Sequence, residues 1–290
     1  MPLRRSTTVD VPDLLPGRIL TLPGRGEMFV RHFRHADDTR PTLLLLHGWT
    51  ASCDTQFFTA YDTLAADYSI IGVDHRGHGR GLRPDTAFTL EDCADDAADV
   101  VRALGVEKVI TVGYSMGGPV SFLVQRRHPE LVEGMVFQAT SMEWRATRGE
   151  RTRWAVSHAF SPLFRRLVTP RSLRWVVKRA LPRGHELARH AAWLVGEIRR
   201  NDQWQVSEAG RAISRFDARP FAPSIPVPAA VVLTTRDRLV PPAKQRELAS
   251  AVRAEVVELH GDHFVTLEQP HEYADATRRA VAAVAGSPAR

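Results

Sequence analysis

Ser115 lies in a G-x-S-x-G pattern, between Gly113 and Gly117, at a predicted junction of a strand and a helix. Residues 109–112 form a short β-branched run, and residues 119–127 carry apolar side chains at the spacing of one helix face. A sharp turn between strand and helix holds a serine hydroxyl clear of the backbone, and flanking glycines give the room that such a turn needs. We therefore predict that Ser115 is a nucleophile rather than a residue of an ordinary turn.

A serine hydroxyl needs two further groups to react at neutral pH, a base that takes its proton and an acid that orients the base. Asp237 follows a predicted strand at residues 229–233, and His263 follows another at residues 256–259. The carboxyl ends of parallel strands meet at one edge of a sheet, so these side chains should converge with Ser115. Their order along the chain is nucleophile, acid, base, and we predict that they form a catalytic triad.

Other residues compete for these roles. His260 lies three residues before the predicted base, but we assign it to the preceding strand. Glu143 follows an earlier strand and is an alternative acid. His75 and His78 lie in a tight predicted turn, where local hydrogen bonding is the simpler interpretation.

The elements that must position these residues alternate between strands and helices. Strands are predicted at residues 43–46, 69–73, 109–112, 131–137, 229–233 and 256–259. Helices are predicted at residues 56–65, 89–104, 119–127, 242–252 and 270–284. The run at 43–46 is apolar without alternation, which is typical of a strand buried on both faces, and residues 19–33 read as a hairpin at the sheet edge. The pattern predicts an α/β fold with a mostly parallel sheet flanked by helices.

The middle of the chain differs from its flanks. Residues 141–220 carry 17 lysines and arginines against 7 acidic residues, and five of the six tryptophans lie there. Strand signals vanish, and apolar stripes at helical spacing are formed by Leu173, Val176, Val177 and Ala180 and by Leu187, Ala191, Leu194 and Ile198. We therefore predict an α/β core whose first part is residues 1–140, a helical cap at 141–221, and a second part of the core at 222–290.

Over about residues 19–284 the chain resembles an esterase- or lipase-like serine hydrolase of the α/β-hydrolase fold superfamily. Besides the serine pattern, the matching pieces are His47-Gly48, the Asp74-x-Arg76-Gly77-x-Gly79 turn, Asp237-x-x-Val240-Pro241, and His263 ahead of Glu268-x-Pro270. The resemblance implies an oxyanion hole made by the backbone amides of Trp49 and Met116. It also implies that the reaction needs no cofactor and no metal.

The sequence departs from the family pattern at several positions. Thr50 replaces a further glycine that some lipases have, Gly81 stands where the turn often continues to serine, and Asp262 precedes the base where a small residue is common. None of these changes removes a member of the triad. No acidic residue replaces Ser115, which argues against haloalkane dehalogenases and epoxide hydrolases of this fold, because they use an aspartate nucleophile.

We therefore expect a cofactor-independent serine hydrolase that cleaves a carboxylic ester, such as a lipid or hydrophobic acyl ester, through an acyl-enzyme. Relatives that act as carbon–carbon bond hydrolases, lactonases, thioesterases or perhydrolases use the same triad, and sequence spacing does not separate them. The alternative outside the enzymes is a non-catalytic ligand receptor with this fold. The intact triad argues against this alternative.

Composition indicates the class of protein, the compartment and the partners to expect. Hydrophobic residues make up 43% of the chain and charged residues 25%, which is near the globular average. No apolar run suits a signal peptide or a membrane span, and Cys53 and Cys93 lack metal-type spacing, so we expect a cytoplasmic protein without disulfides. The basic cap could touch anionic lipid, although a solvated basic face is the simpler interpretation. The chain has no recognised motif for nucleic-acid binding, so no nucleic-acid partner is predicted. The oligomeric state is left open.

Overall fold

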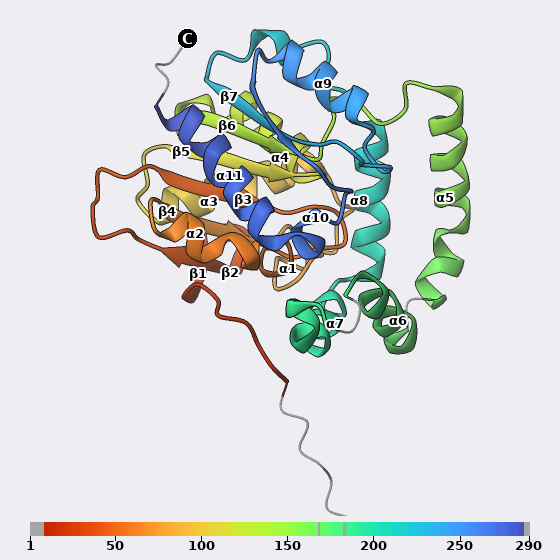
Figure 1. Cartoon of the computed structure of the whole chain (residues 1–290). Coiled ribbons are helices and arrows are strands. Elements are labelled where there is room, and N and C mark those ends of the chain that lie inside the picture. Colours follow the sequence, from red (N-terminus) through yellow and green to blue (C-terminus); the bar gives the residue numbers. More distant parts are fainter. Residues whose placement is uncertain (1–8, 168, 182–183, 287–290) are drawn as a thin grey trace, which may run out of the picture.

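The protein is described by a computed structural model over residues 9–167, 169–181 and 184–286. Within these residues, eight strands form one sheet, with the order β1-β2-β4-β3-β5-β6-β7-β8 (Figure 1). The strands are β1 Gly17–Leu22, β2 Gly26–Phe33, β3 Thr42–Leu46, β4 Ser69–Val73, β5 Val109–Tyr114, β6 Val132–Gln138, β7 Ala229–Thr234 and β8 Glu255–Leu259. The β1–β2 hairpin pairs antiparallel at one edge, and the strands from β4 to β8 pair in parallel. The predicted α/β class and edge hairpin are confirmed.

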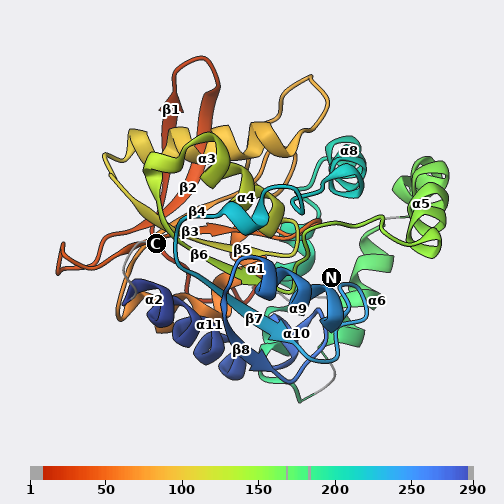
Figure 2. The ribbon, with the colours of Figure 1, turned by 90° about the horizontal axis from the view of Figure 1, so that it is seen from above.

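Helices cover both faces of the sheet (Figure 2). One face carries α3 Leu90–Ala103 and α4 Gly117–Arg127, and the other carries α1 Cys53–Phe57, α2 Tyr61–Ala65 and α11 Pro270–Ala285. Alternation along β3 sends Leu44 and Leu46 into the core under α3 and α4, and Leu43 and Leu45 into the core under α11. A strand buried on both faces must be apolar at every position, which explains the unbroken leucine run.

The first predicted helix, at 56–65, is wrong in detail. It consists of α1, a 3₁₀ turn at Phe58–Ala60 and α2, and it begins three residues earlier. The early start has a local cause in a capping box, since Ser52 Oγ accepts from the Thr55 amide at 3.2 Å and Thr55 Oγ1 accepts from the Ser52 amide at 2.8 Å. The predicted helix start at Thr89 is correct, because Thr89 Oγ1 accepts from the Asp92 amide at 3.0 Å.

The segment between β6 and β7 is helical. It contains α5 Arg148–Leu167, α6 Pro170–Ala180, a 3₁₀ helix at Glu186–His190, α7 Ala191–Ile198 and α8 Gln203–Arg215. Helix α8 stands beside the sheet and α5 lies outside it, while α6 and α7 lie at their lower end in Figure 1. Within the segment predicted to be helical, the sequence indicated no separate helix at α5 or α8, and it did not predict the short helix α10 Val265–Glu268. The side chains of Val176 and Ala180, from the predicted stripes, lie outside the described residues.

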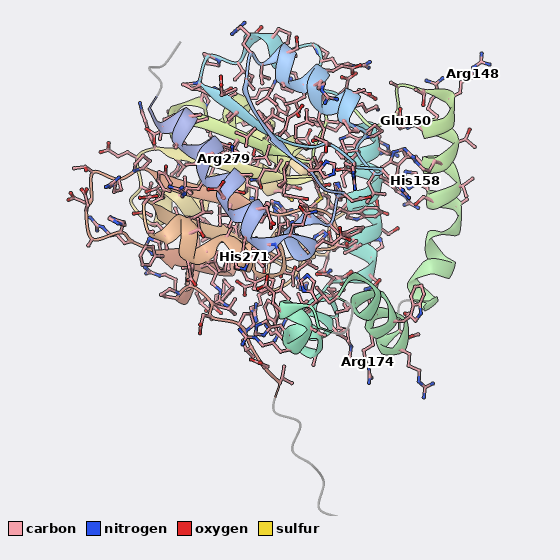
Figure 3. All side chains as sticks on the ribbon, in the orientation of Figure 1. Arg148, Glu150, His158, Arg174, His271 and Arg279 are labelled. Atoms are coloured by element: carbon pink, nitrogen blue, oxygen red, sulfur yellow. The ribbon has the colours of Figure 1, made fainter. Side chains whose placement is uncertain are left out.

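Contacts tie α5 both to α8 and to α9 Pro242–Ala251, which follows β7. His158 lies between α5 and α8 in Figure 3, with Nε2 3.2 Å from Ser214 Oγ, while Arg148 and Arg174 point outward. Glu150 forms an ion pair with Lys244 of α9. We call residues 141–221 the cap segment. The division of the chain into core and cap stays a prediction. In the described part of the chain, none of the helices has the length and apolarity that crossing a membrane requires.

Candidate active site

Ser115 occupies the tight turn between β5 and α4. Its φ of +51° lies in the left-handed region, where a side chain is disfavoured and the surroundings must hold the backbone. The two glycines of the pattern are required by close backbone approaches. A Cβ on Gly113 would lie 2.4 Å from the carbonyl oxygen of Gly117, and a Cβ on Gly117 would lie 1.9 Å from the carbonyl oxygen of Leu46.

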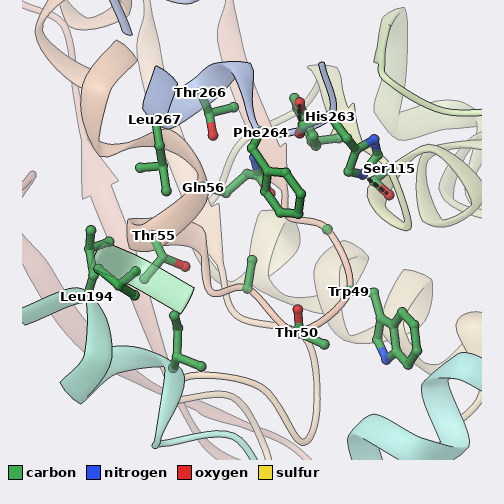
Figure 4. Close-up of a pocket in the computed structure, with 15 residues that line it drawn as sticks. Trp49, Thr50, Thr55, Gln56, Ser115, Leu194, His263, Phe264, Thr266 and Leu267 are labelled. Atoms are coloured by element: carbon green, nitrogen blue, oxygen red, sulfur yellow. Dashed lines mark hydrogen bonds between the residues drawn. The ribbon is translucent and has the colours of Figure 1, made fainter. Parts of the chain in front are cut away.

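The structure brings Ser115, His263 and Asp237 into one hydrogen-bonded chain. His263 Nε2 lies 3.1 Å from Ser115 Oγ (Figure 4), and His263 Nδ1 lies 2.7 Å from Asp237 Oδ2. Because a carboxylate can only accept, Nδ1 carries the proton of that bond in the neutral ring. Nε2 is then the free acceptor that faces the serine hydroxyl. This tautomer is the one that a general base for Ser115 requires.

Asp237 is fixed by the loop that carries it. The residue is 3% exposed, and its Oδ1 accepts from the amides of Leu239 and Val240, both at 2.8 Å. Its Oδ2 accepts from Thr234 Oγ1 at 3.0 Å as well as from the imidazole. These bonds satisfy a buried carboxylate, and they set the direction in which it points toward His263.

Tyr114, the residue before the serine, also holds the base. Its hydroxyl donates to the backbone carbonyl of His263 at 2.8 Å, and its ring meets the imidazole edge-on at 5.7 Å. Burial raises the pKa of Tyr114 well above its usual value, which keeps the hydroxyl a neutral donor. Sequence reasoning missed this residue, because the position is variable in the G-x-S-x-G pattern.

The loop after β3 passes directly beside the nucleophile. A Cβ on Gly48 would lie 3.3 Å from Ser115 Cβ. His47 is buried and holds the loop, since its Nε2 accepts from the His75 amide at 2.9 Å and its Nδ1 lies 2.7 Å from the Gly48 carbonyl. Burial lowers the pKa of His47 to about 4, so the ring is neutral. The roles of the Trp49 and Met116 amides in an oxyanion hole stay predictions.

None of the competing residues has a hydrogen bond to Ser115 in the described part of the chain. The predicted local hydrogen bonding holds for His78, whose Nδ1 lies 3.0 Å from the Arg76 carbonyl, but it is wrong for His75, whose ring nitrogens have no partner there. His260 is exposed just past β8, where its Nδ1 lies 3.0 Å from Thr235 Oγ1, so its assignment to the strand is wrong by one residue. Glu143 accepts from Lys244 Nζ at 2.6 Å and from the Arg145 amide at 2.8 Å. Of the candidates for acid and base, the structure places Asp237 and His263 in line with the serine.

The turn at residues 74–79 supports the same edge of the sheet. Asp74 accepts from the Cys53 amide at 2.6 Å and from the Arg80 amide at 2.7 Å. Gly81, a departure from the family pattern, has a structural cause, since a Cβ there would lie 2.4 Å from the carbonyl oxygen of His75. Serine does not fit at that position without movement of the turn.

In the described part of the chain, two cavities meet at Ser115 and His263. The first has a volume of about 150 Å³ and reaches toward the cap segment, with Leu194 and Leu267 opposite the serine in Figure 4. The second has a volume of about 400 Å³ and lies toward α5 and α8. Its lining includes Trp49, Trp144, Trp154, Ile213, Leu239 and Arg153. Both cavities are mainly apolar, as ligand sites usually are.

The site has no arrangement for a metal in the part of the chain that the structure describes. No group of three or more histidine, cysteine, aspartate or glutamate side chains lies there in positions that could hold an ion. Cys53 and Cys93 are both buried and free.

Comparison with known proteins identifies the family. The family model described as the alpha/beta hydrolase fold matches residues 41–270. The chain belongs to this family. Within it, the chain is similar to a 2-(acetamidomethylene)succinate hydrolase from Mesorhizobium japonicum, with 34% identity over 96 residues that cover 33% of this chain and 34% of the relative. It is also similar to a soluble epoxide hydrolase from a Corynebacterium species, with 35% identity over 91 residues that cover 31% and 32% of the two chains. The matched stretch spans about a third of the length of these curated relatives.

Solved structures extend the likeness to nearly the whole chain. An esterase from Exiguobacterium antarcticum superposes with a TM-score of 0.77 and 18% identity, covering 94% of this chain and all of the esterase chain. An enol-lactonase from Burkholderia xenovorans LB400 superposes with a TM-score of 0.72 and 24% identity, covering 91% and 98% of the two chains. At these identities the likeness shows a shared fold.

Proposed function

We propose that this α/β-hydrolase-fold protein is a cofactor-independent serine hydrolase that cleaves carboxylic esters through an acyl-enzyme. The observation that carries the proposal is the hydrogen-bonded chain from Ser115 through His263 to Asp237, at the meeting point of two apolar cavities. A nucleophile within hydrogen-bond reach of a base, with the base oriented by a third group, is the arrangement that serine catalysis needs.

Acylation would begin when His263 Nε2 takes the hydroxyl proton as Ser115 Oγ attacks the ester carbonyl. Asp237, which accepts from Nδ1, would stabilise the imidazolium that forms. The amides of Trp49 and Met116 would receive the oxyanion of the tetrahedral intermediate. His263 would then give its proton to the leaving alcohol, and the acyl group would stay on Ser115.

Deacylation would reverse these roles with water in place of the alcohol. His263 would take a proton from water as the water oxygen attacks the acyl carbon, and it would return that proton to Ser115 Oγ as the acid leaves. Every proton is accounted for by the imidazole, and no redox step is involved.

The two cavities support an ester with an apolar group on each side of the carbonyl. An esterase and an enol-lactonase are among the proteins with a similar fold, which supports a reaction at a carbonyl–oxygen bond. One relative is a soluble epoxide hydrolase. The resemblance to this superfamily implies that epoxide hydrolysis uses an aspartate nucleophile, and this chain has Ser115 at that position, which argues against epoxide hydrolysis here. Lactone, thioester and carbon–carbon hydrolysis stay as alternatives within the class.

Arg153 supports one refinement of the substrate class. It is an exposed cation that lines the larger cavity beside Trp154 and Trp144, so this cavity suits a group that is apolar and ends in a carboxylate. Arg153→Gln should raise KM for an ester that carries a carboxylate and leave KM for its neutral methyl-ester counterpart unchanged. An equal effect on both substrates would refute the refinement.

The proposal is tested with p-nitrophenyl esters of increasing acyl length, a lactone and a thioester, using Ser115→Ala as the control. Many turnovers per protein molecule with an ester, lost in the control, are expected. Wild-type protein that is labelled once and never turns over would instead favour a ligand receptor. Repeating the panel with anionic vesicles tests the predicted contact between the cap segment and lipid, which should raise the rate for long acyl chains.

A further inference from the structure

The loop beside the nucleophile is held from outside by the cap segment. Asn201, which is 8% exposed and lies just before α8, donates from Nδ2 to the carbonyl of Thr50 at 2.6 Å. Its Oδ1 accepts from the amide of Gly79 at 2.8 Å. The Thr50 carbonyl can only accept and the Gly79 amide can only donate, so these partners fix which end of the Asn201 side chain is nitrogen and which is oxygen. A single side chain therefore joins the loop after β3 to the turn after β4.

Thr50 needs such support. Its φ of +66° lies in the left-handed region, which a β-branched residue rarely adopts, and such a strained backbone persists only where the surroundings hold it. Thr50 is exposed, so packing around its side chain holds this backbone only weakly. The bond from Asn201 to the Thr50 carbonyl fixes this peptide unit directly.

Trp49 is held on its other side by α8, the helix that follows Asn201. Its indole N–H donates to the carbonyl of Val206 in α8 at 2.7 Å. Gly210, one turn further along α8, leaves room for the ring, because a Cβ there would lie 2.8 Å from the Trp49 side chain. Trp49, whose backbone amide is the predicted oxyanion donor, is thus held by α8 at its side chain and by Asn201 at the next carbonyl.

We propose that Asn201 is a positioning residue, which keeps the 48–50 loop in the conformation that aims the Trp49 amide at the substrate oxyanion. The cap segment then has a second task besides lining the cavities, since its docking completes the oxyanion hole. The inference rests on the proposed serine hydrolase function. Its physical basis is that donors stabilise an oxyanion only when they are held at about 2.7–3.1 Å from it.

The matched control is Gln205, a buried amide in the first turn of α8, four residues after Asn201. It is 1% exposed, and its Nε2 donates to the carbonyls of Pro84 at 2.9 Å and Thr86 at 2.8 Å. Gln205 therefore ties the cap segment to the core as Asn201 does, but within the described residues it has no hydrogen bond to the 48–50 loop. Asn201→Ala and Gln205→Ala should lower the urea midpoint to a similar extent.

Catalysis should separate the two variants. Asn201→Ala should lower kcat by about 10- to 100-fold, less than the hundredfold to thousandfold cost of removing an oxyanion donor, with KM nearly unchanged. The Ki of a trifluoromethyl ketone, which forms a tetrahedral adduct on serine, should rise by the same factor as kcat/KM falls. Gln205→Ala should keep kcat and Ki within about threefold of wild type. Equal effects of the two variants, or an unchanged Ki in Asn201→Ala, would overturn the inference.

Two further measurements keep the inference testable. If Asn201→Ala does not fold, Asn201→Asp keeps the acceptor for Gly79 and removes the donor to Thr50, and it should show the same loss of kcat. Hydrogen–deuterium exchange of the peptide around residues 48–51 gives a readout independent of turnover. Exchange there should be faster in Asn201→Ala than in Gln205→Ala, and equal exchange would contradict the inference. Absence of turnover in the wild type would instead refute the proposed function.

Discussion

A fall in pH from 7 to 5 should destabilise this protein through three histidines buried together behind the active site. The ring centroids of His75 and His78 lie 4.3 and 5.4 Å from that of His47. Burial lowers the pKa of His47 to about 4, that of His78 to about 3, and that of His75 well below its usual value. Among the described residues, neither ring nitrogen of His75 has a hydrogen-bond partner.

The direction of the effect follows from these pKa values. Each folded-state pKa lies below the value of about 6.5 in an unfolded chain, so the unfolded chain takes up protons first as the pH falls. The stability that the neutral rings contribute is complete above about pH 7 and is lost as the pH falls through 6.5. For one histidine whose folded-state pKa lies below 5, the loss between pH 7 and pH 5 is about 2 kcal/mol.

Asp74 opposes part of this loss. Burial raises the pKa of Asp74 to about 6, so as the pH falls the folded protein binds this proton before the unfolded chain does. Asp74 therefore adds about 1 kcal/mol to the free energy of unfolding between pH 7 and pH 5. Three histidines and Asp74 together predict a net loss of roughly 5 kcal/mol between pH 7 and pH 5, comparable to the whole stability of a marginal domain.

Urea unfolding at pH 7, 6 and 5 measures this dependence, and His75→Phe isolates one contribution to it. The variant should lose about 2 kcal/mol less than wild type between pH 7 and pH 5. Because the difference is taken within each protein, a constant change in packing cancels. His271→Gln, which alters an exposed histidine outside the cluster (Figure 3), is the control and should keep the wild-type dependence. If His75→Phe shows the wild-type loss, the account of the buried histidines is refuted.

The other predictions concern the tight turn at Ser115 and the triad. Gly117→Ala forces a Cβ against the carbonyl of Leu46 and should lower the free energy of unfolding by about 3 kcal/mol or more, so an unchanged urea midpoint would contradict the geometry of this turn. Asp237→Asn should lower kcat about 10⁴-fold with an unchanged circular dichroism spectrum, and a loss below tenfold would remove Asp237 from the triad. Tyr114→Phe removes the hydrogen bond to the His263 carbonyl and should lower the free energy of unfolding by about 1 kcal/mol. The value of kcat should change only a few-fold. An unchanged free energy of unfolding would mean that this hydrogen bond does not stabilise the fold.

The sequence was most informative where one local rule decides the structure. A strand buried on both faces must be apolar throughout, so the run at residues 43–46 identified a central strand. Loops after parallel strands meet at one edge of the sheet, so Ser115, Asp237 and His263 could be grouped before their distances were known. Thr89 marked the start of α3 because an N-cap is a local hydrogen bond.

The features that the sequence did not predict depend on contacts between segments far apart in the chain. Asn201 and Thr50 are separated by 151 residues, and nothing near either residue predicts their hydrogen bond. Helix α8 was missed although Asp202 caps it, accepting from the amides of Trp204 and Gln205. The support that Tyr114 gives to the base likewise appears only when β5 lies beside the loop after β8.

Ser115 is the proposed nucleophile, and intact-mass and peptide mass spectrometry after treatment with a fluorophosphonate test this role. One adduct per chain, located on the peptide that contains Ser115 and absent from folded Ser115→Ala protein, is the predicted result. An adduct on another residue, or undiminished labelling of Ser115→Ala, would contradict the claim.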